Sequence, residues 1–318
     1  MTKRFAAIGM GGYIAPRHMK AIKETGHDLV AGLDPNDSVG IIDSYFPEMR
    51  FFTEFERFDR HIDKLKRAGE GHKVDFITIC SPNYLHDSHI RFALRSDADV
   101  ICEKPLVLNP WNLDALLDIE RDTGRRVNTI LQLRVHPAIQ ALKAKIDAAP
   151  RDRKFEVELT YVTSRGRWYL QSWKGDEKKS GGIATNIGVH FFDMLHFLFG
   201  DLQENTVHLS EPTKAGGYLE YERARVRWFL SLDLNDVPGA VRDEGQRTYR
   251  SITIDGEEIE FSGGFTDLHT RSYEEILAGR GFGLEENRTA INAVSAIRTA
   301  EVTAPGPDAH PFIRQARA

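Results

Sequence analysis

The chain has 318 residues, of which 41% are hydrophobic and 28% charged, and its formal net charge is −5. This length accommodates about two domains with a core each, and the negative charge disfavours general binding to nucleic acid or anionic membranes. No apolar run approaches the roughly 20 residues of a transmembrane helix, and the N-terminus lacks a signal-peptide pattern. The two cysteines, Cys80 and Cys102, end predicted strands and form no disulfide framework, so we expect a cytoplasmic protein.

The first third of the chain alternates between strand-like and helix-like segments. Apolar runs bounded by turn residues predict strands at 4–9, 27–33, 50–52, 74–80, 99–103 and 127–131. Segments of helical length separate them, the first at 14–24. Such alternation is typical of a parallel sheet with right-handed crossovers, and it predicts a Rossmann-like, doubly wound α/β domain.

The turn between the first strand and the first helix is rich in glycine. Glycines there let the backbone approach a pyrophosphate, which the free N–H groups and the dipole of the helix N-terminus attract. The fit to Gly-x-Gly-x-x-Gly is imperfect, because Ile14 replaces the third glycine, or else the loop is one residue longer and ends at Ala15. The residues assigned to cofactor binding in this turn are Gly9, Gly11, Gly12, Tyr13 and Ile14.

Asp34 ends the second strand, about 20 residues beyond the glycines, where a carboxylate binds the ribose hydroxyls of a dinucleotide. No arginine follows it, and the stretch from Pro35 to Ser38 would meet a ribose 2′-phosphate with additional negative charge. We therefore predict NAD rather than NADP as the cofactor. The alternative is a tight turn and a surface aspartate without a ligand.

Two later loops follow the fourth and fifth predicted strands. The first reads Ser81-Pro82-Asn83-Tyr84-Leu85-His86, and the second reads Glu103-Lys104-Pro105. Ligands of open α/β sheets bind beyond the carboxyl ends of the strands, so Lys104 occupies a position suited to chemistry. The alternative is a solvated lysine before a turn.

The remainder of the chain predicts a different kind of domain. After a helix at 137–148 come long alternating strands without helices between most of them, at 154–163, 206–210, 219–232 and 248–261. This pattern indicates an α+β domain with a large open antiparallel sheet. One face of such a sheet is free to pack on a partner, so we expect a homo-oligomer, with a tetramer favoured over a dimer. The predicted domains are 1–128 and 129–304, followed by a polar tail at 305–318.

Three polar residues share one side of a predicted core helix that follows Ser180-Gly181-Gly182. Asn186, His190 and Asp193 are spaced by four and three residues, which places them on the same helix face. A polar stripe on a buried helix is costly unless it is hydrogen-bonded or used in chemistry. A lone histidine is more often structural, and we interpret His196 in this way.

This set of residues predicts oxidation of a secondary alcohol. The neutral imidazole of His190 would accept the hydroxyl proton while the carbon-bound hydrogen leaves as hydride. The ammonium of Lys104 would stabilise the developing alkoxide. Asp193 would orient His190 or the substrate. The scheme needs no metal ion, and none is predicted.

The segment 164–175 concentrates cations and aromatic rings in an otherwise acidic chain. Arginines bind carboxylates and phosphates through paired donors, and an aromatic ring offers a nucleobase a stacking surface. We therefore predict that this segment binds an anionic substrate; the alternative is a solvated charged loop. The residues assigned to this role are Arg165, Arg167, Tyr169 and Lys174.

The Ser-Pro-Asn-x-x-His loop, the Glu-Lys-Pro motif and the later helix with His190 and Asp193 resemble the Gfo/Idh/MocA family of nicotinamide-dependent sugar oxidoreductases. The resemblance implies a catalytic Lys104. It assigns to the cofactor site, besides Lys104 itself, the residues Ser81, Asn83, His86 and Glu103. Most members have an aspartate where this chain has Asn186, and we take the missing charge to mean that the substrate brings its own carboxylate.

Four segments, 12–18, 132–134, 164–175 and 184–190, resemble more closely the UDP-N-acetyl-D-glucosaminuronate dehydrogenases of that family. This resemblance implies NAD-dependent oxidation of the 3-hydroxyl of UDP-N-acetyl-D-glucosaminuronic acid. Such a step lies on the route to the diacetamido-uronic acids of bacterial surface polysaccharide, including lipopolysaccharide O-antigen, and in some of these enzymes 2-oxoglutarate regenerates NAD. The residues that it adds to substrate binding are Gln132, Arg134, Thr185, Asn186 and His190.

Two alternatives remain open. The chain would be another sugar or inositol dehydrogenase of the family if it turned over a neutral substrate and tolerated Asn186→Asp. It would be a non-catalytic NAD-binding regulator if it bound the cofactor without turnover, although such a protein needs neither Lys104 nor His190.

Overall fold

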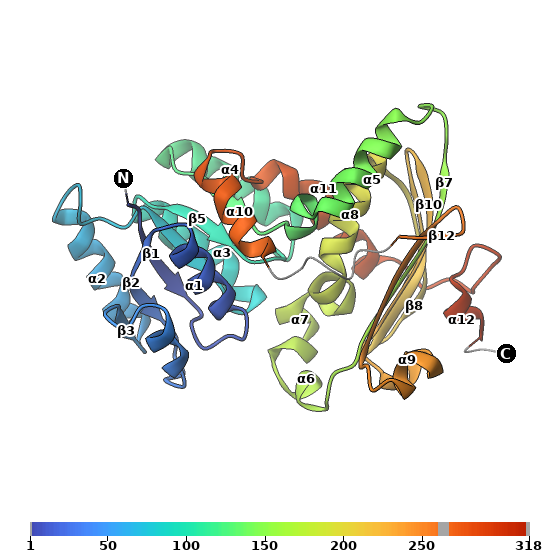
Figure 1. Cartoon of the computed structure of the whole chain (residues 1–318), viewed down its shortest axis with the longest axis horizontal. Coiled ribbons are helices and arrows are strands. Elements are labelled where there is room, and N and C mark those ends of the chain that lie inside the picture. Colours follow the sequence, from blue (N-terminus) through green and yellow to red (C-terminus); the bar gives the residue numbers. More distant parts are fainter. Residues whose placement is uncertain (1, 260–266, 316–318) are drawn as a thin grey trace. The chain divides into compact units, whose positions relative to one another are not determined.

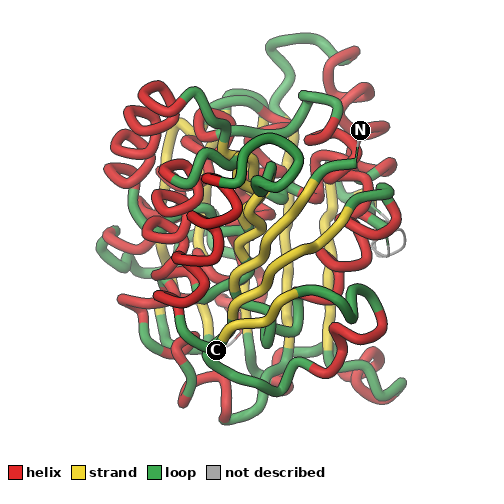
Figure 2. The backbone as a smooth tube through the Cα atoms, turned by 90° about the vertical axis from the view of Figure 1, so that its left-hand side faces the viewer, coloured by secondary structure: helices red, strands yellow, loops and turns green. Residues whose placement is uncertain are grey.

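The computed structural model describes residues 2–259 and 267–315 (Figure 1). The chain divides into two compact units, one comprising 1–132 with 266–288 and the other comprising 133–265 with 289–318. In the described residues, strands gather into two sheets and helices lie against them (Figure 2). The first unit is therefore discontinuous in sequence, whereas we predicted one unbroken second domain over 129–304. None of the described helices has the length and apolar character needed to cross a membrane.

The sheet of the first unit is parallel, with the strand order β3–β2–β1–β4–β5–β6. The bounds are Arg4–Ile8 (β1), Asp28–Leu33 (β2), Arg50–Phe52 (β3), Phe76–Ile79 (β4), Asp99–Cys102 (β5) and Val127–Thr129 (β6). Every residue of β4 is buried, as expected for a strand covered on both faces. Since β1 pairs with both β2 and β4, the order reverses between β1 and β4, and such switch points bind ligands.

Helices cover both faces of this sheet. They are α1 (Ala15–Glu24), α2 (Phe55–Arg67), α3 (His86–Arg95), α4 (Pro110–Thr123) and α10 (Leu268–Leu277), with the short turns η1 (Gly40–Ser44) and η2 (Asn83–Leu85). The chain moves one way across the sheet through α1 and the other way through α2, α3 and α4, so right-handed crossovers place α1 on the opposite face. The late helix α10 packs beside α1, and its Tyr273 joins the core of Phe5 and Met19.

The sheet of the second unit has the order β12–β11–β7–β10–β9–β8. The bounds are Phe155–Thr163 (β7), Leu202–Ser210 (β8), Lys214–Tyr221 (β9), Ala224–Ser231 (β10), Thr248–Ile254 (β11) and Glu257–Glu258 (β12). The described pairs are antiparallel except for β7 with β10, which is parallel. The sheet is thus mixed, because the helices after β7 carry the chain to the far edge and the β8–β9–β10 meander returns it beside β7.

Two of the strands predicted here are divided by turns. The predicted strand at 219–232 is a hairpin that turns at Glu222 and Arg223 between β9 and β10. The predicted strand at 248–261 ends at Ile254 and turns at Asp255 and Gly256 into β12, and its last two residues lie outside the described part of the chain.

The helices α5 (Pro137–Ala148), α8 (Val189–Phe199) and the later part of α11 (Leu284–Thr299) contribute buried residues to one core with the sheet of the second unit. Trp228 of β10 and Phe192 of α8 meet in this core with their ring centroids 5.3 Å apart. Short turns connect the larger elements: η3 (Gln132–Val135), α6 (Trp168–Gln171), η4 (Trp173–Gly175), α7 (Glu177–Ser180) and the π-helical turn η5 (Ala184–Gly188). The helix predicted at 137–148 is confirmed.

The opposite face of this sheet carries a smaller core, which includes Val162, Phe229 and Ile313. The elements near it are η6 (Leu234–Asp236), α9 (Gly239–Asp243) and α12 (Pro311–Gln315). His310, just before α12, is 1% exposed and hydrogen-bonds Thr160 of β7. The described part of 305–318 is therefore docked on the sheet, and the predicted polar tail is wrong for it, because its few apolar and aromatic residues suffice to bury it.

Candidate active site

The turn after β1 presses the backbone against the end of β4. Gly9 has φ +93°, and a Cβ on it would lie 2.5 Å from the backbone of Cys80 and Ser81. A Cβ on Gly12 would lie 3.2 Å from the carbonyl oxygen of Gly9. Glycine is therefore required at the first position, and the turn occupies the switch point of the sheet.

Asp34 lies beside this turn at the end of β2. Its Oδ2 accepts the Gly11 N–H at 2.8 Å, and its Oδ1 accepts the Asn36 N–H at 2.8 Å. A Cβ on Gly11 would lie 3.1 Å from the Asp34 carboxyl group. Because Gly11 has no side chain, the Asp34 carboxylate can lie against its backbone. The sequence predicted that this carboxylate contacts the ribose of a dinucleotide.

The start of α1 offers a place for phosphate. Ile14 caps the helix without a side-chain hydrogen bond, and the first turn contains no acidic residue. The positive end of the helix dipole is therefore not compensated by a nearby carboxylate. Tyr13 is 80% exposed beside it. The glycine turn, the helix start and Asp34 together fit a dinucleotide.

The loop after β4 holds Ser81, Asn83 and His86, all of them buried. The Ser81 Oγ lies 2.9 Å from His89 Nδ1. The His86 ring lies between two carbonyl oxygens, with Nδ1 2.7 Å from that of Pro105 and Nε2 2.8 Å from that of Ser81. His86 therefore ties two loops together, which differs from the cofactor contact that the family resemblance implied.

Glu103 is also an internal anchor rather than a surface for ligands. Its Oε1 lies 2.9 Å from His18 Nε2 and 2.9 Å from His269 Nε2, while Oε2 accepts the Lys104 N–H at 3.2 Å. Burial alone would raise the pKa of Glu103, but the hydrogen bonds from both histidines outweigh it and hold this pKa well below its usual value. The carboxylate is thus ionised and occupied, which differs from the predicted role in cofactor binding.

His18, Glu103 and His269 are residue types that bind metal ions, and they lie together. Their 2.9 Å separations are those of hydrogen bonds. The Tyr273 hydroxyl lies 2.9 Å from both His18 Nδ1 and Thr78 Oγ1, so one order of donors fits: Thr78 to Tyr273, Tyr273 to His18, His18 to Glu103. Burial lowers the pKa of His18, which agrees with a neutral ring.

Lys104 lies directly beyond β5, half-buried, with a cis peptide bond to Pro105. Because β5 is parallel to β4, Lys104 shares with the Ser81 loop the carboxyl edge of the sheet at which the glycine turn lies. The first unit therefore brings the predicted cofactor residues and the predicted catalytic lysine to one edge.

The second unit holds the other predicted residues around η5 and α8. The Asn186 amide donates to the Tyr169 hydroxyl, which joins η5 to the cationic segment 164–175. His190, in the first turn of α8, is half-buried, and its ring centroid lies 4.2 Å from that of Phe191 and 6.2 Å from that of Tyr161. An imidazole among aromatic rings is held in orientation by packing, as a general base requires.

Asp193, one α-helical turn further on, has a different role from the one predicted. The Arg134 guanidinium donates to both of its oxygens, at 3.0 and 2.7 Å, and both side chains are buried. Burial raises the pKa of Asp193, and the guanidinium opposes that shift. Arg134 and Asp193 therefore bind each other, whereas we predicted that Arg134 would bind substrate and that Asp193 would orient His190 or the substrate.

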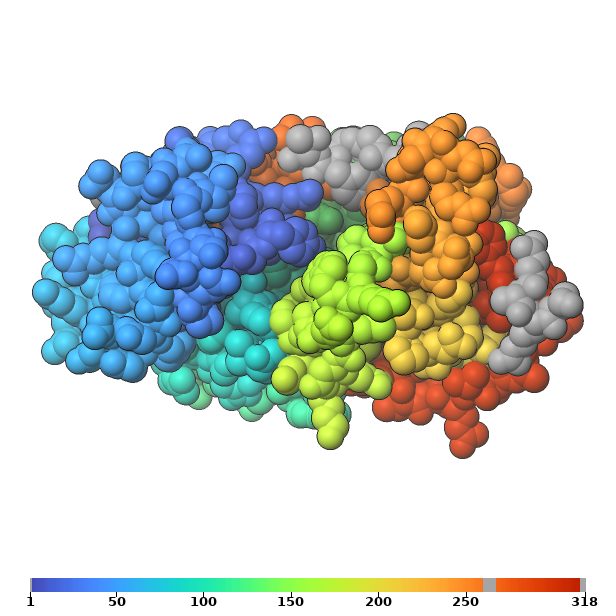
Figure 3. Space-filling model, turned by 90° about the horizontal axis from the view of Figure 1, so that it is seen from below, coloured from blue at the N-terminus to red at the C-terminus, as the bar shows by residue number. Residues whose placement is uncertain are grey.

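The cationic segment lies on the surface of the second unit, as the yellow-green atoms in Figure 3 show. Arg165, Arg167 and Trp168 are exposed, and Lys174 Nζ lies 3.8 Å from the ring centroid of Trp173. Tyr169 is buried, and it lines a cavity of about 210 Å³ together with Lys174, Arg298 and other residues. The predicted cations thus lie at the surface and at the rim of a cavity that the sequence did not predict.

Thr185 and Gln132, also in the predicted substrate set, are less exposed than Arg165 and Arg167. Thr185 is fully buried, and a Cβ on Gly181 would lie 2.7 Å from its side chain, so Thr185 is a packing residue. Gln132 is half-buried at the start of η3.

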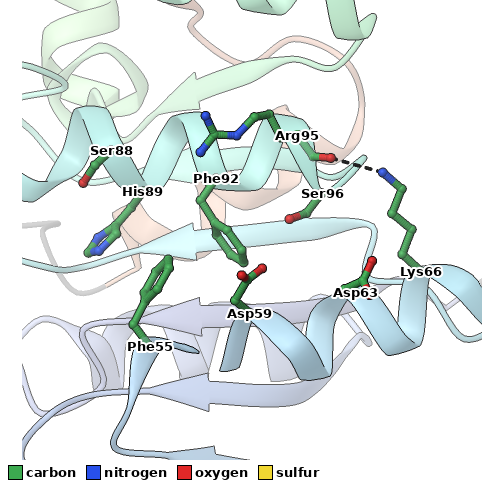
Figure 4. Close-up of a pocket in the computed structure, with 9 residues that line it drawn as sticks. All are labelled: Phe55, Asp59, Asp63, Lys66, Ser88, His89, Phe92, Arg95 and Ser96. Carbon is green, nitrogen blue, oxygen red and sulfur yellow. Dashed lines mark hydrogen bonds between the residues drawn. The ribbon is translucent and has the colours of Figure 1, made fainter. Parts of the chain in front are cut away.

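A groove of about 510 Å³ between α2 and α3 was not predicted from any motif (Figure 4). Phe55 stacks on His89 at its edge with ring centroids 5.7 Å apart, and burial lowers the pKa of His89 to about 4. The residues that line it are Phe55, Asp59, Asp63, Lys66, Ser88, His89, Phe92, Arg95 and Ser96.

Known proteins share both halves of this chain. Residues 3–130 match the model of an oxidoreductase family, NAD-binding Rossmann fold, and residues 153–234 match the C-terminal alpha/beta domain of the same Gfo/Idh/MocA family. The curated inositol 2-dehydrogenase of Rhizobium meliloti is 30% identical over 209 residues, which are 63% of this chain and 56% of that protein. The chain thus aligns with little more than half the length of this relative.

Solved structures agree over the full length. Two crystal structures show the WlbA (WbpB) dehydrogenase from Thermus thermophilus, one in complex with NAD and alpha-ketoglutarate and one with NAD and UDP-GlcNAcA. That protein is 54% identical to this chain, and its structures match with a TM-score of 0.94 over 98% of this chain and 100% of that one. The WlbA dehydrogenase from Bordetella pertussis, at 19% identity and a TM-score of 0.76 over 96% of this chain and 98% of that one, shows the fold alone.

The first unit combines a glycine turn suited to a dinucleotide with an acid at the end of β2 and a lysine beyond β5. The second unit adds a histidine on its core helix. Together these features define the class of nicotinamide-dependent oxidoreductases. With the matches above, the assignment can be made to a family. The chain belongs to the Gfo/Idh/MocA family and is an NAD-dependent dehydrogenase.

Proposed function

We propose that this chain oxidises the 3-hydroxyl of UDP-N-acetyl-D-glucosaminuronic acid to the 3-keto sugar with NAD. The observation that carries the proposal is the Asn186–Tyr169 hydrogen bond, which sets a neutral amide beside a cationic segment. A substrate with a carboxylate and a diphosphate suits this arrangement, since the side chain at position 186 carries no negative charge. The full-length similarity to a dehydrogenase crystallised with NAD and UDP-GlcNAcA supports the same substrate.

In this mechanism the chain supplies a base and a cation. NAD, when bound, supplies the hydride acceptor. His190 takes the proton of the hydroxyl, for which a neutral imidazole is suited near pH 7. The Lys104 ammonium stabilises the oxygen as its negative charge develops, and contacts from buried side chains to the backbone of Lys104 and Pro105 hold the lysine in place for this role.

Binding of the substrate anions falls to the cationic segment. Arg165 and Arg167 are exposed, so their guanidinium groups are available to carboxylate or phosphate oxygens. Trp168, 55% exposed beside them, offers an aromatic face to the uracil ring.

The cellular role that we propose follows from the substrate. The 3-keto product leads to diacetamido-uronic acids of bacterial surface polysaccharide, such as O-antigen, and 2-oxoglutarate regenerates NAD by accepting the hydride. The chain acts in the cytoplasm as a homo-oligomer, most simply a tetramer. The first unit binds the cofactor, and the second unit binds the sugar and the neighbouring subunits.

The test follows the nicotinamide absorbance of the purified protein. UDP-N-acetylglucosaminuronic acid should produce bound NADH, and 2-oxoglutarate should discharge it. If the sugar leaves the spectrum unchanged while NAD is bound, the proposed substrate is wrong, and neutral sugars and inositols are tested next. Formation of NADH by the sugar without its discharge by the keto acid would remove only the recycling step.

Asn186→Asp is the variant that tests the charge argument. It should weaken binding of the uronate, by about tenfold for an unfavourable interaction of about 1.4 kcal/mol, and leave binding of UDP-N-acetylglucosamine unchanged. Equal effects on both sugars would contradict the argument, and Asn186→Ser serves as the uncharged control.

A further inference from the structure

The backbone around Lys104 is held by side chains, because the sheet ladder ends before it. The last ladder contact on this side is the hydrogen bond from the Glu103 N–H to the Ile79 carbonyl at 3.0 Å. Beyond it, the Lys104 N–H donates to the Glu103 carboxylate at 3.2 Å, and the Pro105 carbonyl lies 2.7 Å from His86 Nδ1. The dipeptide Lys104-Pro105 is therefore held at both ends by buried side chains.

His86 occupies a place from which it reaches both loops at the active edge. It is the first residue of α3, which packs against β4 and β5, and it is 1% exposed. Its second nitrogen, Nε2, lies 2.8 Å from the Ser81 carbonyl, in the loop after β4. One ring thus spans the ends of two neighbouring strands, and the two contacts come from different nitrogens.

Burial lowers the pKa of His86, and a neutral imidazole carries one N–H, so only one of the two carbonyl oxygens accepts a hydrogen bond from the ring. We place that N–H on Nδ1, whose oxygen is the nearer of the two. Without Nδ1, the Pro105 carbonyl would lose its buried hydrogen bond. Leaving a buried polar group unpaired in this way costs about 1–3 kcal/mol. An asparagine at position 86 places an amide N–H near Nδ1 and leaves Ser81 without its contact. A glutamine places an amide N–H near Nε2 and leaves Pro105 without its contact.

We propose that His86 is a positioning residue for the reaction: it holds the Pro105 carbonyl and so fixes the Lys104 side chain where the developing alkoxide needs it. The proposal rests on the catalytic role of Lys104 in the proposed function. Glu103 holds the same dipeptide at its other end, and through His18 it ties that dipeptide to α1, the helix that follows the glycine turn.

The test compares His86→Asn with His86→Gln. His86→Gln should lower kcat by about 10²-fold, because a displacement of roughly 1 Å at a reacting group has an effect of this size. His86→Asn should lower kcat far less, since it keeps the donor to Pro105. Both variants should bind NAD as the wild type does, and the kinetic isotope effect with substrate deuterated at C3 should rise in His86→Gln, because the chemical step becomes limiting. The exposed His72, replaced by asparagine and glutamine, is the matched control.

The outcomes separate positioning from a merely structural role. Equal losses of kcat in the asparagine and glutamine variants, in proportion to a fall in Tm or in NAD affinity, would overturn the proposal, as would normal turnover in His86→Gln. Lys104→Met is measured alongside. If Lys104→Met keeps normal turnover, the catalytic assignment in the proposed function fails and the positioning role fails with it; if it loses turnover while His86→Gln keeps it, only the positioning role fails.

Discussion

The Arg134 guanidinium and the Asp193 carboxylate form a buried bidentate salt bridge in the second unit, with hydrogen bonds of 3.0 and 2.7 Å. A buried pair of this kind is costly to break from one side, because the remaining charge stays buried. Asp193→Asn should therefore lower the free energy of unfolding by about 3–5 kcal/mol. Replacing both residues together, with Arg134→Met and Asp193→Leu, should cost much less. Chemical denaturation measures both.

The matched control for this prediction is Asp147→Asn, which breaks the exposed pair with Lys143. An exposed pair of this kind contributes only about 0.3–0.5 kcal/mol. A double variant as unstable as Asp193→Asn would show that the side chains pack in some way that the ion pair does not explain.

The glycine turn makes a prediction about close packing. Gly9→Ala should lower NAD affinity and stability together, because the methyl group would overlap the backbone of Cys80 and Ser81 and force the turn away from β4. Gly26→Ala is the control: Gly26 has φ +78° with no atom within 4 Å of the built Cβ, so it carries the conformational cost without the overlap. Isothermal titration with NAD and thermal denaturation give both quantities. Equal NAD affinities in the two variants would contradict the argument.

Asp34 should set the preference for NAD. Removing its carboxylate with Asp34→Ala should weaken NADH binding by roughly 10- to 100-fold, which corresponds to the ~1.5–3 kcal/mol of a hydrogen bond to a charged group. Binding of NADPH should weaken less or improve, because the repulsion of its 2′-phosphate is lost. Fluorescence titration of both cofactors tests this, with the exposed Asp37→Ala as control. Parallel losses for both cofactors would place Asp34 away from the ribose.

His310 should make the second unit sensitive to acid. Its Nδ1 accepts the Phe312 N–H at 3.2 Å, so Nε2 carries the proton that bonds Thr160, and a second proton has no acceptor there. Burial lowers the pKa of His310 to about 3, against 6.5 in the unfolded chain. Because the folded pKa is the lower one, the unfolded state takes up the proton first, and stability is lost as the pH falls below 6.5.

The comparison variant is His310→Gln, which does not titrate. The stability advantage of the wild type over this variant should shrink by about 2–3 kcal/mol between pH 7.5 and pH 4.5. Urea denaturation followed by tryptophan fluorescence measures it. A difference that stays constant with pH would mean that His310 is not held neutral.

Local signals were sufficient to predict most of the first unit. The glycine turn, the strands on either side of it and Asp34 all follow from patterns within about 35 residues, and the structure brings them together at β1 and β2. The hairpin between β9 and β10 was missed because Glu222 and Arg223 are not residues that mark a turn. Short-range patterns describe elements well, and they fail where a turn is imposed by pairing.

The roles of polar residues were harder to predict than the elements. His86, Glu103 and Arg134 were assigned to ligands and Asp193 to orienting His190 or the substrate. Each of these side chains instead contacts other groups of the protein. The partners of Glu103 lie 85 and 166 residues away. A sequence motif therefore identified residues that matter at the site without showing whether they contact a ligand or hold its neighbours.

The position of α10 also affects how the chain is made. On the ribosome, residues 1–132 emerge well before Tyr273, whose hydroxyl binds His18 across 255 residues of sequence. At about 5–20 residues per second, synthesis of the intervening segment takes on the order of 10 seconds. During that time the Glu103 carboxylate has His18 but not His269 as a partner, and Phe5 of β1 lacks its contact with Tyr273. The cofactor-binding half is thus finished only after the second unit has been largely synthesised, so a fragment that ends at residue 132 should bind NAD poorly and aggregate unless 267–288 is supplied.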